Sequence, residues 1–117
     1  MDIQTQTTKE DFIKTREDYK IILGNYMIFS DGTLYNFKSD KILNPTITDK
    51  GYYRTRIKSK NYFIHRLVAY AFLDFGLERR DMVVDHININ KLDNRIKNLR
   101  IITQQQNVNN VRLRPDE

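Results

Sequence analysis

Two short apolar runs separated by a polar loop constrain this chain more than any other feature. The first run is a pair of valines, which Asp85 and His86 follow directly, and the second run spans residues 99–102. Both runs are rich in β-branched or apolar residues, as strands are. Thr103 follows the second run as an expected N-cap, so a helix is predicted to start there and to carry Asn107 on its second turn. The stretch therefore predicts a strand, a loop, a second strand and a helix.

Asp85, His86 and Asn107 have the chemistry of a metal-assisted hydrolytic site. An acid beside a histidine, with a second oxygen ligand presented by a helix, is the minimum set for one-metal phosphodiester cleavage. Histidine titrates close to neutral pH, so the neutral form of His86 can take a proton from water. The oxygens of Asp85 and Asn107 suit one hard divalent cation per site, Mg²⁺ or Mn²⁺. Taken singly, such residues are more often an ordinary strand-end acid and a packed histidine, and only their combination favours a site.

Asp85, His86, Asn98 and Asn107 together resemble the motif of the HNH nuclease family, in particular the HNH homing endonucleases of phages. The family's motif places a metal-binding acid with the general base, a structural asparagine, and a second metal ligand at these positions. The third letter here is Asn in place of His, the H-N-N variant of the phage branch. The resemblance implies that His86 and Asn98 are catalytic, Asn98 by holding the loop with its amide. It also implies that Asp85 and Asn107 bind the metal.

The resemblance extends to residues 51–54 and 65–72, so it covers roughly residues 25–110. It implies a small α+β fold, in which an antiparallel N-terminal sheet with a packing helix is followed by a ββα-metal (His-Me finger) unit. One compact domain is expected. Its parts are an N-terminal arm and helix, a sheet and helix that contact DNA, and the nuclease motif, over residues 1–24, 25–81 and 82–117.

The activity implied by the resemblance is that of a divalent-metal-dependent DNA endonuclease, which nicks or cuts double-stranded DNA and leaves 5′-phosphate and 3′-hydroxyl ends. The alternative is a non-catalytic DNA-binding module on the same scaffold. Members of this branch often carry a C-terminal helix-turn-helix, for which the residues after the motif are too few. Target choice is therefore expected to rest on a basic hairpin of this chain, or on a homodimer or protein partner.

Charge is distributed unevenly along the chain. Residues 1–49 hold six of the 20 Lys and Arg residues and eight of the 15 Asp and Glu residues, a balance of −2. Residues 50–117 hold the other fourteen and seven, a balance of +7. The basic half also carries the motif, which favours a polyanion such as double-stranded DNA as the partner. Basic residues that only solvate the surface are the alternative explanation.

Composition excludes several other classes of protein. Cysteine is absent, which removes a thiolate zinc site and a cysteine nucleophile. No apolar run approaches the length of a membrane span, and no signal-peptide pattern opens the chain. A soluble protein without membrane contact is expected, located in the cytoplasm, and in the host cytoplasm if a phage encodes it.

A basic strand pair over residues 52–64 is the most informative segment outside the motif. Cations alternate there with packing residues, which at a period of two predicts a single cationic face. A turn is expected at residues 59–61. The face is predicted to bind DNA, because arginine suits both phosphates and guanine edges; the alternative is an edge strand guarded by lysines against aggregation. The predicted DNA-binding residues of this face are Arg54, Arg56, Lys58 and Lys60.

Three cations outside that strand pair, Arg66, Arg95 and Lys97, are also predicted to contact DNA. His65 precedes the first of them and is expected to be a packed or capping histidine, with a phosphate contact as the alternative. Asp93 is expected to cap a short turn and is only a minor candidate for a third metal ligand.

Three further elements are predicted from local signals. A helix is expected from Lys9 to about Tyr19, N-capped by Thr8. Strands over residues 26–29 and 33–37 flank an Asp-Gly turn and predict a hairpin. A helix over residues 65–73 has an apolar stripe and is expected to pack on the sheet.

Overall fold

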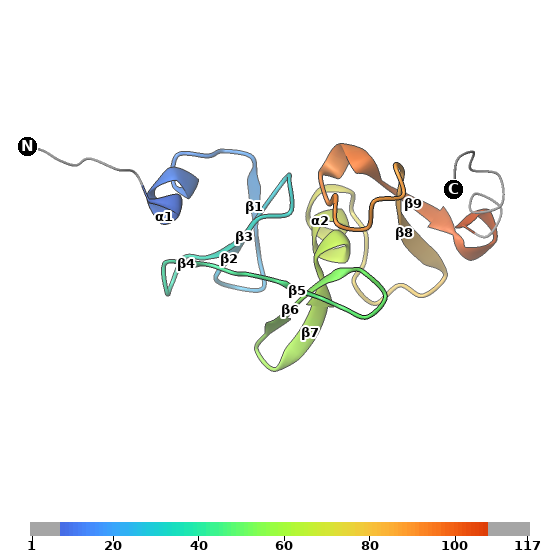
Figure 1. Ribbon diagram of the computed structural model, residues 1–117, viewed down its shortest axis with the longest axis horizontal. Coiled ribbons are helices and arrows are strands. Elements are labelled where there is room, and N and C mark those ends of the chain that lie inside the picture. Colours follow the sequence, from blue (N-terminus) through green and yellow to red (C-terminus); the bar gives the residue numbers. More distant parts are fainter. Residues whose placement is uncertain (1–7, 108–117) are drawn as a thin grey trace, which may run out of the picture.

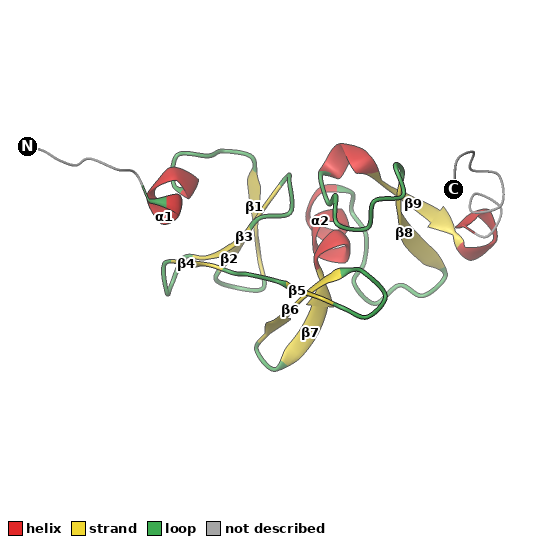
Figure 2. Cartoon of the chain, viewed as in Figure 1, coloured by secondary structure: helices red, strands yellow, loops and turns green. Residues whose placement is uncertain are grey.

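Helix α2 lies at the centre of the computed structural model, between the N-terminal sheet and the last strand pair (Figure 1). The structure describes residues 8–107, so residues 1–7 of the predicted arm and residues 108–117 of the predicted motif unit lie outside it. All three sheets are antiparallel, with the orders β1-β2-β3-β4, β5-β6-β7 and β8-β9 (Figure 2). The elements are α1 (Lys9–Ile13), β1 (Tyr19–Ile22), β2 (Tyr26–Phe29), β3 (Leu34–Asn36), β4 (Lys41–Ile42), β5 (Thr46–Ile47), β6 (Tyr53–Ile57), β7 (Lys60–Phe63), α2 (Ile64–Phe72), β8 (Met82–His86), the 3-10 helix η1 (Ile96–Asn98) and β9 (Leu99–Thr103).

The predicted α+β fold is confirmed, and α2 forms the centre of its hydrophobic core. Leu67, Val68 and Ala69 are fully buried, and the helix packs against strands of all three sheets. Full burial of a leucine or valine side chain stabilises a fold by roughly 1.5–3 kcal/mol. The helix predicted over residues 65–73 is therefore confirmed, shifted by one residue toward the N-terminus.

The first predicted helix is correct at its start and wrong at its end. Thr8 is the N-cap, and its side chain accepts a hydrogen bond of 3.0 Å from the backbone N–H of Asp11. The helix ends at Ile13, however, and Tyr19 begins β1, where it pairs with Phe29. Pairing in the sheet and the packing of the Tyr19 and Phe29 rings, 5.6 Å apart, outweigh the weak helical pattern.

The predicted Asp-Gly hairpin is confirmed as β2 and β3, and its tip contacts the segment between β8 and β9. The backbone N–H of Ile96 donates a 2.8 Å hydrogen bond to the carbonyl of Ser30. Gly32 has a φ of +93°, and a Cβ added there would stand 3.1 Å from the Cβ of Asn94 and 3.3 Å from the Cγ2 of Ile64. Glycine is needed for both the backbone conformation and the close approach.

We expect Gly32→Ala to destabilise the fold by on the order of 1–3 kcal/mol, because it adds backbone strain and overpacks a tight contact. Urea unfolding measures the loss. Gly51→Ala is the matched control, since Gly51 has a similar φ of +88° but its nearest neighbour is the Cδ of Lys91 at 3.7 Å. An equal loss in both variants would show that the hairpin tip does not press on Asn94.

The cationic hairpin β6–β7 differs from its prediction in where it turns. Lys58 and Ser59 both have positive φ, 52° and 69°, as the two central residues of a type I′ turn do. The turn therefore precedes Lys60, which pairs with the buried Ile57 and stands on the opposite face from Arg54 and Arg56. The prediction that all four cations share one face is wrong, because the parity count assumed a later turn.

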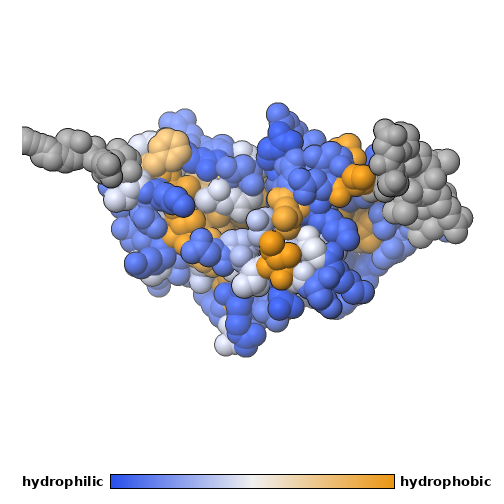
Figure 3. Space-filling model, in the orientation of Figure 1, coloured by the Kyte–Doolittle hydropathy of each residue, from blue (hydrophilic) through white to orange (hydrophobic). Residues whose placement is uncertain are grey.

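Much of the face seen in Figure 3 is hydrophilic, and its apolar side chains form small separate patches. Among residues 8–107, no helix has the length and apolar character that crossing a membrane requires.

Candidate active site

Strands β8 and β9 place Asp85 and His86 at the end of a buried strand pair. Asp85 pairs with Arg100 and His86 with Leu99 across the ladder. The Nε of Arg100 donates a 2.9 Å hydrogen bond to the Oδ2 of Asp85, and the Asp85 side chain is only 7% exposed. A buried carboxylate needs such a cationic partner to keep its charge inside the protein.

The helix predicted after β9 begins as expected at Thr103. Its backbone N–H donates to the Oε1 of Gln106 at 2.9 Å, and the backbone N–H of Gln106 donates to the Oγ1 of Thr103 at 3.0 Å. These reciprocal hydrogen bonds form a capping box, which confirms Thr103 as the N-cap. Residues 104–107 are helical and carry the half-buried Asn107.

One cavity of about 470 Å³ brings the predicted metal ligands and the predicted base together. Asp85 and His86 from β8 and Asn107 from the helix all line it, beside Arg66 and Lys91. Residues 8–107 contain no group of three or more His, Cys, Asp or Glu side chains that could hold a metal. One carboxylate and one amide nevertheless fit Mg²⁺, which uses few protein ligands and takes the rest from water and substrate phosphates.

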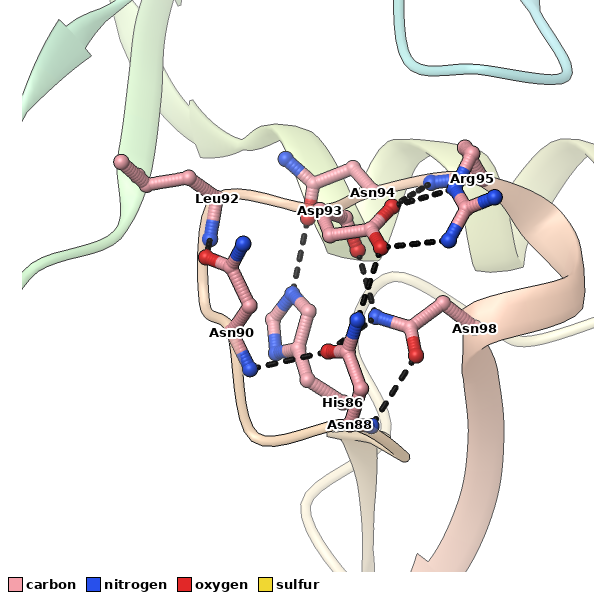
Figure 4. Close-up of polar contacts among 8 residues, drawn as sticks. All are labelled: His86, Asn88, Asn90, Leu92, Asp93, Asn94, Arg95 and Asn98. Carbon is pink, nitrogen blue, oxygen red and sulfur yellow. Dashed lines mark hydrogen bonds and ion pairs between the residues drawn. The ribbon is translucent and has the colours of Figure 1, made fainter.

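The imidazole of His86 is held by Asn94, a residue to which the sequence assigned no role. Its Nε2 lies 2.8 Å from the Oδ1 of Asn94 (Figure 4). Both side chains are buried, His86 at 5% and Asn94 at 4% exposure. In the neutral tautomer that donates from Nε2 to this oxygen, Nδ1 is the basic nitrogen.

Burial lowers the pKa of His86 from its ordinary value. The hydrogen bond to Asn94 and the charges of Asp85 and Asp93 oppose this shift without reversing it. The imidazole is therefore neutral at neutral pH, which is the form a general base requires.

Asn98 ties the two ends of the motif loop together. Its Nδ2 donates to the Oδ1 of Asn88 at 2.9 Å and to the carbonyl of Asp93 at 2.8 Å, while its Oδ1 accepts from the backbone N–H of Asn88 at 3.0 Å (Figure 4). Both donor and acceptor groups of the buried amide are thus used within the loop. The geometry is that of the loop-holding role expected of Asn98, whose effect on catalysis stays a prediction.

Asp93 and Arg95 complete the loop by pairing with each other. The Nε and one terminal nitrogen of Arg95 donate to the two carboxylate oxygens of Asp93, each at 2.7 Å (Figure 4). This side-chain hydrogen bonding lowers the pKa of Asp93. The carboxylate of Asp93 is also bound by the Nδ2 of Asn88 at 2.9 Å, which gives it a structural function within the loop.

His65 packs directly against the ring of His86. Its ring centroid lies 4.9 Å from that of His86, 5.1 Å from Tyr52 and 5.6 Å from Phe63. Burial, and then the charges of His86 and Arg66, lower the pKa of His65 to about 3. Within residues 8–107 its buried Nδ1 has no hydrogen-bond partner. His65 is a packed, neutral histidine in the wall of the cavity.

The predicted DNA-binding cations occupy varied surroundings. Arg54, Arg56, Lys58, Lys60, Arg95 and Lys97 are exposed, and the Nζ of Lys58 also donates to the carbonyl of Leu23 at 2.8 Å. Arg66 donates to the carbonyl of Leu77 at 2.8 Å, and its guanidinium lies 4.9 Å from the ring centroid of Phe75. Lys91 was not predicted, yet it lines the cavity, with its Nζ 3.0 Å from the carbonyl of Lys50.

The family model and the similar proteins found by comparison all point to the same family. A family model described as HNH endonuclease matches residues 62–109. The DNA endonuclease I-HmuI of Bacillus phage SP01 is 40% identical over 98 residues, which are 80% of this chain and 55% of that protein. The H-N-H endonuclease F-TflII of Escherichia phage T5 is 32% identical over 95 residues, 76% of this chain and 49% of that protein. This chain thus spans about half the length of these relatives.

The fold is also similar to a solved structure. A structure described as DNA binding and cleavage by the HNH homing endonuclease I-HmuI superposes with a TM-score of 0.69 at 36% identity, covering 80% of this chain and 57% of that one. The matched family segment contains all four motif residues, from Asp85 to Asn107.

Proposed function

We propose that this chain, which belongs to the HNH endonuclease family, hydrolyses phosphodiester bonds of double-stranded DNA with the help of one divalent metal ion. One observation carries the proposal: a single cavity gathers Asp85, Asn107 and a neutral His86 whose ring is held by Asn94. Residues 25–81 serve as the DNA-contacting part and residues 82–117 as the nuclease part.

The chemistry follows from the roles of these side chains. Asp85 and Asn107 would hold Mg²⁺ or Mn²⁺, which when bound neutralises charge on the scissile phosphate and the departing 3′ oxygen. His86 accepts a proton from the water that attacks phosphorus, with Asn94 keeping its ring in place. The Nε of Arg100 donates a hydrogen bond to the Oδ2 of Asp85 and so holds this carboxylate in place within the buried strand pair. The products carry a 5′-phosphate and a 3′-hydroxyl.

A nicking assay on supercoiled plasmid, with Mg²⁺ and with EDTA, tests the proposal. Relaxed or linear plasmid formed only with the metal is the expected result. The alternative is a DNA-binding module without catalysis, which would bind the plasmid and leave it supercoiled. The exposed cations of the basic half suit both functions, whereas the gathering of Asp85, His86 and Asn107 favours the enzyme.

Alanine at either proposed ligand, Asp85→Ala or Asn107→Ala, is expected to slow plasmid nicking and to raise the Mg²⁺ concentration required. Each variant removes one oxygen ligand from the cavity. Asn107→Asp is the matched variant, because it keeps an oxygen at the same place, and it should retain part of the activity. Thermal melting in EDTA checks that each variant is folded. Mg²⁺ titrations identical to that of the wild type would exclude this pair of ligands.

A further inference from the structure

A second cavity of about 600 Å³ lies beside the active-site cavity, between β7 and the segment that leads from α2 to β8. Phe63, Arg66, Val83 and Gln104 line both cavities, so the two are adjacent and share a wall. We call the second cavity the arginine groove. Its charged lining residues are Lys60, Arg66, Glu78, Arg79 and Arg80.

Two of these cations form the wall of the groove. Arg66 donates to the carbonyl of Leu77 and lies over the ring of Phe75. Arg79 is paired with Asp81 through hydrogen bonds of 3.0 and 2.6 Å. The guanidinium of Arg66 thus ties the segment after α2 to the helix, whereas Arg79 is paired within that segment.

The other two cations are available to a ligand. Arg80 is exposed, and its side chain makes no hydrogen bond or ion pair with any residue from 8 to 107. Lys60 is exposed at the start of β7, with its Nζ 5.8 Å from the ring centroid of Tyr62. The charge of Arg80, after burial, lowers the pKa of Arg66, so the two guanidinium groups repel each other. An anion between such cations would relieve their repulsion.

The register of the basic hairpin extends this positive surface. Arg54 stands opposite Phe63, and Arg56 stands opposite Asn61. Opposed residues of an antiparallel pair share a face, and both Phe63 and Asn61 line the groove. The two exposed arginines therefore stand on the same face of the hairpin as Phe63 and Asn61, the face opposite to that of Lys60.

We propose that the arginine groove binds the phosphate backbone of the DNA strand next to the scissile bond, with Arg80 and Lys60 as its phosphate contacts. The proposal rests on the proposed function, because the groove shares a wall with the cavity of Asp85 and His86. Cations in a groove beside the reacting centre suit backbone positioning, which requires charge and no base recognition.

Salt-dependent binding tests the groove directly. Arg80→Gln and Lys60→Gln remove charge from exposed side chains, and Lys38→Gln removes it from the exposed β3–β4 turn at the other end of the molecule (Figure 1). Affinity for a mixed-sequence DNA duplex is measured by fluorescence anisotropy in EDTA over a salt series. Each groove variant should lower the slope of log affinity against log salt by about 0.9, and the pair together by about 1.8. Lys38→Gln should leave the slope unchanged.

The outcomes separate the groove from the enzyme. Wild-type slopes in both groove variants would overturn the groove, whatever the plasmid assay shows. Slopes lowered as expected, in a chain that nicks no plasmid, would support the groove on a DNA-binding module and overturn the enzyme. A wild-type chain that does not bind the duplex would overturn both. Each variant should also melt at the temperature of the wild type. A lower slope of log affinity against log salt then reports lost phosphate contacts and not unfolding.

Discussion

His86→Ala is expected to slow DNA cleavage on the order of 10²–10⁴-fold, the usual contribution of a general base. The imidazole is buried, neutral and held at Nε2 by Asn94, so its Nδ1 is the basic nitrogen in a cavity that also contains the proposed metal ligands. DNA affinity in EDTA should stay close to that of the wild type, because the exposed cations are unchanged. Single-turnover nicking of plasmid with Mg²⁺ gives the rate.

A conservative variant separates chemistry from packing in this experiment. His86→Gln keeps a polar side chain of similar length that can contact Asn94, but it has no group able to accept a proton from water near neutral pH. It should therefore be as slow as His86→Ala while melting closer to the wild type. Wild-type nicking by either variant would remove His86 from the mechanism.

Local signals were enough to predict the order of elements in the nuclease motif. Two apolar runs, a polar loop and a capping threonine each act within a few residues, and the structure has the strand, loop, strand and helix that they indicate. Asn107 reaches the same cavity as Asp85 and His86 because the helix starts at Thr103, as its capping box requires.

What the sequence did not reveal depends on contacts between distant segments. Asn94 is one polar residue among many in its loop, and its significance comes from the ring of His86 on one side and the close approach of Gly32 on the other. The arginine groove likewise exists only because the segment after α2 folds back beside β7. Spacing along the chain carries no signal for either arrangement.

The position of the turn in the β6–β7 hairpin decides on which face each cation lies, and the sequence did not reveal that position. Strand parity correctly placed Arg54 and Arg56 together, since both lie on β6. It failed for Lys58 and Lys60, because the strand ends at a type I′ turn formed by Lys58 and Ser59. The alternation of faces along β6 therefore does not extend to these two lysines. Neither turn residue is the Asn or Gly that usually marks such a turn, so nothing in the local sequence indicated it.

His65 connects the packing of the site to the pH dependence of stability. Its pKa in the folded protein is lowered to about 3, mainly by burial, against an ordinary value of 6.5. Below pH 6.5 the unfolded chain gains a proton at this histidine that the folded chain does not gain until about pH 3. The stabilising effect of a neutral His65 is thus complete above pH 6.5 and is lost as the pH falls through this window.

The free energy of unfolding should therefore fall by about 1.4 kcal/mol for each pH unit within the window, or by about 2 kcal/mol between pH 6.5 and 5. Urea unfolding at pH 7 and pH 5 measures the change.

His65→Phe is the matched control, since it keeps a ring against Tyr52 and removes both the titration and the unpartnered Nδ1. It should lose less stability than the wild type over this interval. The pKa of His86 is lowered too, and His86 is present in both proteins, so the comparison reports the titration of His65 together with its coupling to His86. An equal loss of unfolding free energy in the two proteins would mean that His65 takes up its proton in the folded state. The rings of His65, Tyr52 and Phe63 beside His86 would then be open to water.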